Sequence, residues 1–331
     1  MNLSLIFPVL KLLADGKFHS GEAIAKHFNV SRATVWNALQ EAQALNIEIF
    51  SVHGRGYKLP GAFTWLSEEA ILAEMHAKNL NAIFALEVHD NLPSTNSYLM
   101  QTLPEKGQTP RCIVANLQTQ GRGRRGRTWA SQLGGSLTFS ILWRFQNGAA
   151  TLSGLSLAVG VALARTLHQF GLTKAQLKWP NDIVVKNADH VEKLAGILIE
   201  LQGDMEGPTH AVIGVGMNLH LSHALKTEID QPATDLNSLQ ADINPNHFLA
   251  HFLHHTAEIF TQFEQHGFAP LRDEWNSLHA FHAQPVKMLH PNGSETVGTV
   301  FNVAEDGVLL VQTLAGLARF SSGEISLRSN A

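Results

Sequence analysis

The segment of the chain best suited to chemistry is residues 121–127, which read GRGRRGR. Arginine offers planar, permanently charged donors that suit phosphate and carboxylate groups, and glycine lets the backbone approach a ligand closely. The composition therefore favours a binding loop for a phosphorylated or adenylated ligand. A solvated basic loop or a nucleic-acid arm would have the same composition, so the loop alone does not decide between them.

The same loop contains the spacing GxGxxG, which makes a dinucleotide-binding unit the first alternative to test. That unit needs a helix that opens at the third glycine and an acidic residue about 20 positions later. Here Trp129–Gly135 leads into a strand-like run instead, and Gln146 stands in the region where the acid belongs. We therefore reject a dinucleotide-binding fold.

A second segment reads KWPND at residues 178–182, and KLAGIL follows it at residues 193–198. The side-chain oxygens of Asn181 and Asp182 are ligand types that Mg²⁺ accepts. Lys193, on the following strand, has the charge to neutralise an α-phosphate. Taken singly, a turn at Asn181-Asp182 and a surface position for Lys193 are the simpler interpretations.

These segments need a scaffold, and residues 63–282 have the pattern of a mixed α/β domain. Strand-like runs occupy Ile83–Val88, Cys112–Leu117, Ser136–Phe145, Gln176–Trp179, Lys193–Leu201 and His210–Leu219. Helical runs occupy Thr95–Leu103, Thr151–Gly171, Asn246–Gly267 and Pro270–Phe281. Because many neighbouring strands look hairpin-joined, we expect a mixed or antiparallel sheet rather than a parallel one.

The first 62 residues predict a winged helix-turn-helix. Ser20 is a suitable N-cap for a short second helix, and Ser31 for a third helix that runs from Arg32 to about Leu45. Asn29 tolerates the left-handed conformation that the turn between them needs. Two short strands around a basic turn at residues 53–56 complete the pattern of a wing.

Residues 283–331 predict a small SH3-like β-barrel, which makes the whole chain an α+β protein. Alternating runs at Pro285–Leu289, Thr296–Val303 and Gly307–Gln312 are separated by turn sequences. The segment Arg319–Ile325 is expected to close the barrel.

Composition and charge narrow the function classes. The 331 residues carry a net charge of −4, but the first 60 hold six basic and four acidic side chains, which permits DNA contact by this part alone. The single cysteine, Cys112, excludes an internal disulfide and a cysteine zinc site. No apolar run is long enough to span a membrane, and no signal-peptide pattern is present. We expect a cytoplasmic protein without a membrane partner.

Taken together, the motifs resemble those of the biotin–protein ligases, in the same order along the chain. They are Ser94-Thr95-Asn96, Gln118, GRGRRGR, KWPND, KLAGILIE and Gly214-Val215-Gly216-Met217-Asn218. The N-terminal winged helix and the C-terminal GEISLR at residues 323–328 match the subgroup that doubles as biotin-operon repressor. The resemblance implies a central domain like that of class II aminoacyl-tRNA synthetases. It also implies an ATP-dependent reaction that forms biotinyl-5′-AMP and pyrophosphate, after which a lysine of the biotin carboxyl carrier protein of acetyl-CoA carboxylase accepts biotin.

The resemblance also assigns a biotin site. Its residues would be Ser94, Thr95, Asn96, Gln118, Gly121, Arg122, Gly123, Arg124, Trp129, Lys193, Gly196, Leu198 and Gly214. Polar side chains at Ser94, Thr95 and Gln118 suit the ureido head of biotin. The aliphatic ring and tail need apolar walls, which Trp129 and Leu198 can supply.

The implied nucleotide side completes the expected active site. Its residues would be Arg124, Arg125, Arg127, Asn181, Asp182, Lys193 and Asn218. Lys193, Asp182 and Arg124 are the expected catalytic residues, with Lys193 placed where transition-state charge develops at the α-phosphate. Asp182 is expected either to place the Mg²⁺ that accompanies ATP or to orient the acceptor lysine.

The repressor subgroup implies DNA and a second copy of the chain as partners. Adenylated biotin would act as corepressor, and the adenylate-bound homodimer would bind biotin operator DNA, with a dimer edge near Ile197–Leu201. The expected DNA contacts are Ser31, Arg32, Thr34, Trp36, Asn37 and Arg55. Trp36 is equally compatible with a core position.

Two departures from the family pattern concern loops. The Asn187–Glu192 hairpin is longer than in the best-known member and is expected to be a surface turn. The loop Ser222–Asp235 is also longer, and no tryptophan stands near Leu236, where that member stacks one on adenine. The adenine contact in this chain is therefore open.

Two rival functions and one rival site remain. A lipoate or octanoate ligase shares the fold, but the GRGRRGR loop argues against it. A ligand-sensing repressor without ligase activity is disfavoured by the intact loop with Asp182 and Lys193. Four histidines form one helical stripe, and no carboxylate or cysteine completes a metal set, so a solvated helix face is expected there: His247, His251, His254 and His255.

Overall fold

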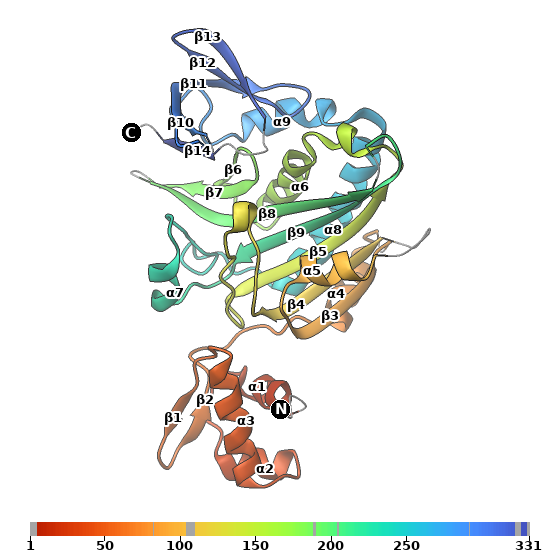
Figure 1. The fold of residues 1–331 in the computed structure, drawn as a ribbon. Helices are drawn as coiled ribbons and strands as arrows, with labels where there is room; N and C mark the ends of the chain where they lie inside the picture. Colours follow the sequence, from red (N-terminus) through yellow and green to blue (C-terminus); the bar gives the residue numbers. More distant parts are fainter. Residues whose placement is uncertain are drawn as a thin grey trace.

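The computed structural model describes residues 5–81, 83–103, 110–187, 190–203, 205–290, 292–321 and 326–329. It places three units in chain order along one long axis (Figure 1). The N-terminal helical unit lies at one end of the central sheet, and the C-terminal sheet lies at the other end. The fold is α+β, as the sequence predicts.

The N-terminal unit is the predicted winged helix-turn-helix. Its elements are α1 (Ile6–Leu13), α2 (Gly21–His27), α3 (Arg32–Ala44), β1 (Phe50–Val52) and β2 (Gly56–Lys58). The hydroxyl of Ser20 accepts a hydrogen bond from the Ala23 amide, and that of Ser31 accepts one from Thr34, so both are N-caps. Asn29 has a φ of 52°, the left-handed conformation that the turn requires.

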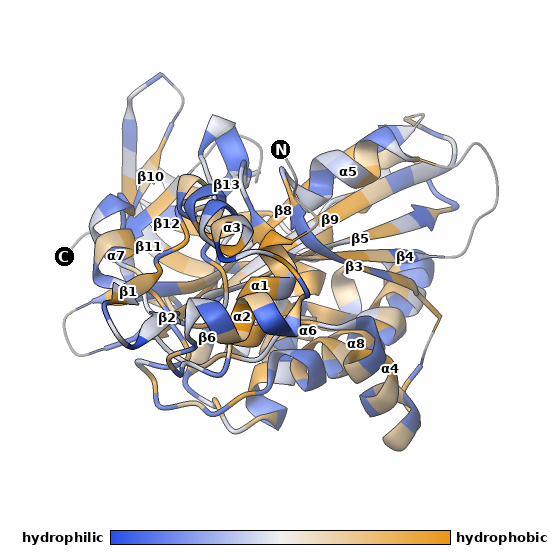
Figure 2. Ribbon diagram, turned by 90° about the horizontal axis from the view of Figure 1, so that it is seen from below, coloured by the Kyte–Doolittle hydropathy of each residue, from blue (hydrophilic) through white to orange (hydrophobic). Residues whose placement is uncertain are grey.

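The central unit contains one seven-stranded sheet in the order β3-β4-β5-β9-β8-β7-β6. The strands are β3 (Ala85–Leu92), β4 (Arg111–Gln118), β5 (Ser136–Phe145), β6 (Ala175–Lys178), β7 (Asp182–Lys186), β8 (Val191–Gly203) and β9 (Thr209–Asn218). Only the β3–β4 pair is parallel, which confirms the expected mixed sheet. Hydrophobic residues run along β5 and β9 in the middle of the sheet (Figure 2).

Helices pack on both faces of this sheet, with α5 (Thr95–Gln101) on one face and α4 (Glu68–Ala77), α6 (Leu155–Gln169) and α8 (Pro245–His266) on the other. The unit also contains α7 (His223–Glu228), which buries no side chain, α9 (Arg272–Ser277) and 3-10 turns at Arg124–Gly126, Ala149–Leu152 and Ala269–Leu271. On one face, Leu99 of α5 forms a small hydrophobic cluster with residues of β4, β5 and β9. On the other face, residues of the central strands form the larger hydrophobic core with α4, α6 and α8. The helix expected over Pro270–Phe281 is shorter, and the sequence did not predict α4 or α7.

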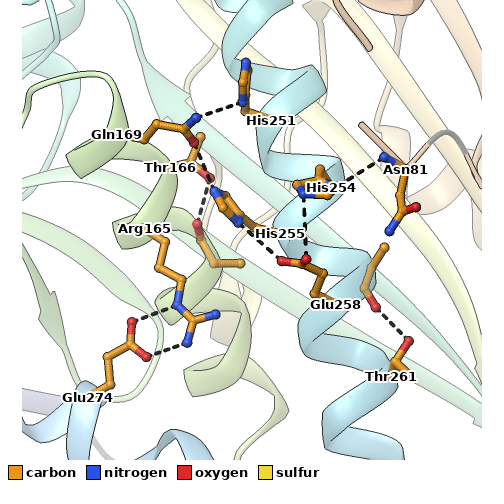
Figure 3. A network of polar contacts seen from close by, with 12 residues as sticks. Asn81, Arg165, Thr166, Gln169, His251, His254, His255, Glu258, Thr261 and Glu274 are labelled. Atoms are coloured by element: carbon orange, nitrogen blue, oxygen red, sulfur yellow. Dashed lines mark hydrogen bonds and ion pairs between the residues drawn. The ribbon is translucent and has the colours of Figure 1, made fainter. Parts of the chain in front are cut away.

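The histidine stripe of α8 is solvated only in part: His247 is exposed as expected, but His251, His254 and His255 pack against neighbouring elements (Figure 3). His251 is buried, and its Nδ1 accepts a hydrogen bond from the side-chain amide of Gln169 in α6. The other ring nitrogen lies 3.1 Å from a carboxylate oxygen of Glu74 in α4, and His255 contacts the oxygen of the same Gln169 amide. The stripe therefore joins three helices. Within the described ranges, no three side chains are arranged to hold a metal ion.

The C-terminal unit is a five-stranded antiparallel sheet in the order β13-β12-β11-β10-β14. Its strands are β10 (Pro285–Leu289), β11 (Glu295–Val303), β12 (Leu309–Thr313), β13 (Gly316–Phe320) and β14 (Ser326–Ser329). The amide of Asn276 in α9 bonds both backbone groups of Val303, which fixes this sheet to the central unit. Residues 322–325 of the predicted closing segment, which include the start of GEISLR, lie outside the described residues, as do residues 188–189 of the longer hairpin and Pro291 of a predicted turn.

Among the described residues, no helix combines the length and the apolar character that crossing a membrane would need.

Candidate active site

The predicted biotin residues converge on one small cavity of about 60 Å³. Residues of α5, β4, β8 and β9 and of the loop that follows β4 line this cavity. Twelve of the thirteen line it: Ser94, Thr95, Asn96, Gln118, Arg122, Gly123, Arg124, Trp129, Lys193, Gly196, Leu198 and Gly214. Gly121 does not; a Cβ there would lie 2.3 Å from the carbonyl oxygen of Trp129, so it packs behind the wall. We call this space the first cavity.

A buried polar network surrounds the N-terminus of α5. The side-chain oxygen of Gln118 accepts hydrogen bonds from the amide of Thr95 at 2.7 Å and from its hydroxyl at 3.1 Å. The Thr95 hydroxyl also lies 2.6 Å from the hydroxyl of Ser140, which donates to Asn96 Oδ1 at 2.5 Å. Because β4 and β5 carry Gln118 and Ser140, the sheet holds these groups in fixed positions before a ligand arrives. The sequence did not predict Ser140.

The apolar wall of the first cavity is the indole of Trp129, and glycines make room for it. A Cβ at Gly216 would lie 2.3 Å from the indole ring, and one at Gly196 would lie 2.8 Å from the Lys193 ammonium nitrogen. These two strand positions accept only glycine without rearrangement. Among the described residues, the buried indole nitrogen of Trp129 has no hydrogen-bond partner.

Arg122 points to a partner that the sequence did not predict. Its guanidinium donates to both carboxylate oxygens of Glu200, at 2.7 and 3.2 Å, and the amide of Asn96 bonds the same carboxylate at 2.9 Å. Glu200 is the last residue of KLAGILIE, and that position in the motif was the only signal for it. Arg122 therefore lies at the rim of the first cavity with its charge already paired.

A second, larger cavity of about 460 Å³ opens from the first. All seven residues expected on the nucleotide side line it: Arg124, Arg125, Arg127, Asn181, Asp182, Lys193 and Asn218. The Lys193 ammonium pairs with Asp182 at 2.7 Å, and Arg124 donates to the side-chain oxygen of Asn181 at 3.0 Å. Burial lowers the pKa of Arg124, against the opposing effect of the Asp182 charge.

Lys193 lines both cavities, together with Gly123, Arg124, Trp129 and Asn181. Its strand, β8, continues into Gly196 and Leu198 of the first cavity. An anionic ligand in one cavity and a second anionic ligand in the other would therefore meet at the Lys193 ammonium. This arrangement suits a reaction between a carboxylate and a phosphate.

The loop after β9 closes the far side of the second cavity. Leu236 is buried away from it, whereas Ile229 and Ala233 line it. The amide of Asn218 donates to the carbonyl oxygen of Thr234 at 3.0 Å, so it ties this loop to the sheet. Sequence reasoning also missed Lys178, Leu327 and Arg328 on this cavity.

The residues expected at DNA share an exposed surface of the N-terminal unit. Arg32, Trp36 and Asn37 are exposed on α3, and Trp36 is 53% exposed, which excludes the core alternative. Ser31 is committed to the N-cap, and its hydroxyl also contacts that of Thr34. Arg55 of the wing stacks 4.1 Å above the Phe18 ring.

Comparison with known protein families assigns each unit separately. A model of an HTH domain matches residues 7–58. A model of the biotin/lipoate A/B protein ligase family matches residues 88–218, which contain both cavities' main segments. A model of the biotin protein ligase C-terminal domain matches residues 283–328.

Individual proteins match over more of the chain. The bifunctional ligase/repressor BirA of Escherichia coli is 34% identical over 97% of this chain and 96% of its own length. BirA of Bacillus subtilis is 27% identical over 95% of both chains. The biotin protein ligase of Aquifex aeolicus, solved in complex with biotin and ATP, superimposes with a TM-score of 0.63 at 29% identity, over 74% of this chain and 99% of that one. The chain thus belongs to the biotin–protein ligase family, in the group of bifunctional ligase/repressors that carry an N-terminal helix-turn-helix domain.

Proposed function

We propose that this chain activates biotin with ATP to biotinyl-5′-AMP and then transfers biotin to a lysine of the biotin carboxyl carrier protein of acetyl-CoA carboxylase. The single observation that carries the proposal is the pair of joined cavities with Lys193 on both. The first has a buried polar network and an indole wall, which suit a ureido head and an aliphatic ring. The second is lined by arginines that suit phosphates.

In the activation step, a carboxylate oxygen of biotin attacks the α-phosphorus of ATP. The bond from that phosphorus to the α,β-bridging oxygen breaks, and pyrophosphate leaves with the electron pair. The two anions repel each other, and charge grows at the phosphoryl oxygens. Lys193 and Arg124 stand at the junction of the cavities, where fixed positive charge stabilises that transition state most. Arg122 is released from Glu200 when a ligand carboxylate or phosphate competes for its guanidinium.

Magnesium would enter with ATP and be held by Asp182 together with phosphate oxygens. One carboxylate oxygen of Asp182 faces Lys193, which leaves the other for the ion, and a single protein carboxylate is common in Mg²⁺ sites shared with nucleotides. The ion would supply further positive charge at the phosphates. In place of a tryptophan, Ile229 and Ala233 would pack against adenine.

The transfer step needs a second substrate in the same place. The ε-amine of the acceptor lysine attacks the carbonyl carbon of the mixed anhydride, and AMP leaves with the electron pair of the broken carbon–oxygen bond. Asp182 lies 2.7 Å from the Lys193 ammonium, and its carboxylate would hold the incoming amine.

Isotopic exchange of pyrophosphate into ATP tests the proposal. We expect exchange that depends on biotin, and transfer of biotin to a purified carrier domain. Exchange driven by lipoate or octanoate instead of biotin would assign the chain to the lipoate side of the family. Absence of exchange with any of these acids, in protein that still binds biotin, would leave a ligand-sensing repressor without ligase activity.

We further propose that the adenylate-bound chain dimerises and represses transcription at biotin operator DNA, with biotinyl-5′-AMP as corepressor. Pairing of β7 with β8 ends at Gly196, and Asn181 bonds both backbone groups of Ile197, so residues 198–203 of β8 have a neighbouring strand on one side only. This free edge begins beside the first cavity, and Leu201 is exposed on it. The exposed surface of α3 would enter the major groove, with Arg55 of the wing at the DNA backbone.

Sedimentation with and without biotinyl-5′-AMP tests the dimer. We expect the adenylate to strengthen self-association and operator binding together. If the association constant is the same with and without biotinyl-5′-AMP, the chain is a ligase that carries a winged helix, but biotin does not control its dimerisation.

We propose domain boundaries after residues 62 and 282. We also propose that the protein acts in the cytoplasm. The N-terminal core supports the first boundary, since its residues run from Ile6 to Leu59, although Leu117 of the central unit joins them. Lys11 also pairs with Asp90 of the central unit at 2.8 Å, across this boundary.

A further inference from the structure

Glu200 connects the GRGRRGR loop to the buried polar network of the first cavity, although it does not line that cavity itself. It lies on β8, and its side chain is 22% exposed. Its carboxylate receives the guanidinium of Arg122 from the loop and the side-chain amide of Asn96 from α5. Arg122 is exposed and can turn to a ligand, whereas Asn96 is buried and bonded on its other side as well. The contact with Asn96 is therefore the one that a ligand leaves in place.

The side-chain amide of Asn96 has one favourable orientation, and Glu200 determines it. The Glu200 carboxylate and the Leu198 carbonyl oxygen lie 2.9 and 3.4 Å from the amide nitrogen, and both groups accept hydrogen bonds but cannot donate them. The carboxylate is the closer acceptor and the charged one, so it holds the NH2 group on its side. The amide oxygen must then face Ser140. A Cβ at Gly214 would lie 2.2 Å from this oxygen, so the oxygen packs directly on β9.

This orientation fixes the roles of two hydroxyl groups. Because an amide oxygen only accepts, the hydroxyl of Ser140 donates its single proton to Asn96. In its 2.6 Å contact with the hydroxyl of Thr95, Ser140 can then only accept. The side-chain oxygen of Gln118, 3.1 Å from the same Thr95 hydroxyl, is an acceptor too. The Thr95 proton therefore points into the protein, and a lone pair of the Thr95 oxygen remains for a ligand in the first cavity, which Thr95 lines.

Reversal of the Asn96 amide would weaken this restriction. Its NH2 group would donate to Ser140, and the Ser140 hydroxyl would donate to Thr95. Of the two acceptors beside the Thr95 hydroxyl, only Gln118 would remain, and the Thr95 proton could turn toward the cavity at lower cost. With both acceptors in place, the same turn would leave two oxygens facing the Thr95 oxygen without a proton between them, which is unfavourable in a buried site.

We propose that Glu200 is a positioning residue for ligand selectivity: through Asn96 and Ser140 it keeps the Thr95 hydroxyl an acceptor, which selects a ligand head with an N–H donor at that place. The proposal rests on the proposed ligase function and deepens it, because the ureido head of biotin carries two N–H groups. A ring that presents an oxygen there would face a lone pair of Thr95. A carboxylate outside the cavity thus sets selectivity without contact with the ligand.

Two cyclic carbamates test this selectivity. Each is a biotin analogue in which an oxygen atom replaces one of the two ureido N–H groups, and equilibrium binding to the full chain gives Kd for biotin and for both analogues. We expect the carbamate whose oxygen faces Thr95 to bind the unsubstituted chain about thirtyfold more weakly than biotin, which corresponds to ~2 kcal/mol. In Glu200→Met, which keeps the length of the side chain and removes the acceptor, this ratio should fall to about fivefold. The ratio for the other carbamate should not change.

Two further variants separate the acceptor from the charge. In Glu200→Gln the amide oxygen can still accept from Asn96, so the thirtyfold ratio should persist although the ion pair with Arg122 is lost. Ser140→Ala takes away one of the two acceptors of the Thr95 proton and should lower the ratio as Glu200→Met does. It also provides the test if Glu200→Met does not fold.

Glu192→Met and Thr138→Val are the matched controls. Glu192 lies on the same strand as Glu200, accepts a hydrogen bond from the side-chain amide of Asn187 and lines neither cavity. Thr138 is fully buried on β5, and its hydroxyl donates to the carbonyl oxygen of Ala115. Both variants should leave every ratio unchanged.

Four results would overturn the positioning role. The first is a thirtyfold ratio that persists in both Glu200→Met and Ser140→Ala. An equal loss of affinity for biotin and both carbamates would make Glu200 a support of the loop or of the fold. If Glu200→Gln behaves as Glu200→Met, the effect belongs to the charge on Arg122. Normal binding of biotin without preference over either carbamate would remove the selectivity alone, whereas failure of the unsubstituted chain to bind biotin would remove the proposed ligase function itself.

Discussion

Replacing Lys193 by alanine removes a cationic side chain that lines both the first and the second cavity. Two effects follow, and they can be separated. The reaction loses a fixed positive charge at the place where the carboxylate meets the α-phosphate. The folded protein keeps Asp182 without its ion-pair partner, which is 2.7 Å away in the intact chain.

The two effects differ in size. Loss of one preorganised charge at a transition state slows a reaction by about 10²–10³, or ~3–4 kcal/mol. The Lys193 and Asp182 side chains are 17% and 14% exposed, so the pair lies between a surface and a buried ion pair. We expect the unpaired carboxylate to lower the free energy of unfolding by about 1–3 kcal/mol. At roughly 2–4 °C per kcal/mol, the chain stays folded at room temperature.

The double variant Lys193→Ala/Asp182→Asn distinguishes chemistry from stability. The neutral amide no longer needs a cation, so we expect thermal unfolding to return toward that of the intact chain. Pyrophosphate exchange should stay at least about 10²–10³ slower, because Asp182 is itself expected to serve the reaction. Lys174→Ala serves as the control for removal of a lysine. Recovery of the exchange rate in the double variant would refute the reasoning, because Lys193 would then act only by neutralising Asp182.

Three further outcomes follow from the structure. Gly216→Ala drives a methyl group to within 2.3 Å of the Trp129 indole; the half-saturating biotin concentration should rise at least ~tenfold, whereas Gly61→Ala, with open space around it, should leave it unchanged. Arg32→Ala should weaken operator binding by roughly 1–3 kcal/mol in a mobility-shift assay at unchanged exchange rate, and equal retardation would count against the α3 assignment. Burial lowers the pKa of His279 from 6.5 to about 3, so between these two pH values His279 is protonated in the unfolded chain and neutral in the folded one. The free energy of unfolding should therefore fall as the pH decreases from 6.5 toward 3, by up to ~1.4 kcal/mol per pH unit, and an equally steep decline in His279→Leu would show that another group is responsible.

Much of the fold follows from local sequence rules. The Ser20 and Ser31 caps form as predicted because a capping hydroxyl needs only the amide three residues later. The limits of β5 coincide with the expected Ser136–Phe145. Apolar residues recur at every second position from Leu137 to Phe145, and glycines and polar residues bound the segment, which is the pattern of a strand. The short helix α7 was missed because none of its six residues is buried, so the sequence shows no apolar periodicity there.

The candidate site was predictable as a set of segments, but not as a set of partners. Family motifs located Arg122, Lys193 and the KWPND segment. Nothing in the sequence indicates that Arg122 pairs with Glu200. Nor does it indicate that Lys178 of β6 and Arg328 of β14 line the same cavity, the second one. These side chains come from distant parts of the chain. Periodicity in the sequence indicates which face of an element a residue occupies, but it does not indicate which distant residue will be its partner.

The histidine stripe illustrates the same division. The sequence determined by itself that His247, His251, His254 and His255 share one face of a helix, because spacing of three and four residues fixes a face. Whether that face meets water or protein depended on where α4 and α6 pack, and the buried His251 lies against both. Local propensity and periodicity act within a few residues, and so they determine elements. Partners, cavities and net charge in a cavity depend on how the elements close on one another, which only the tertiary structure decided.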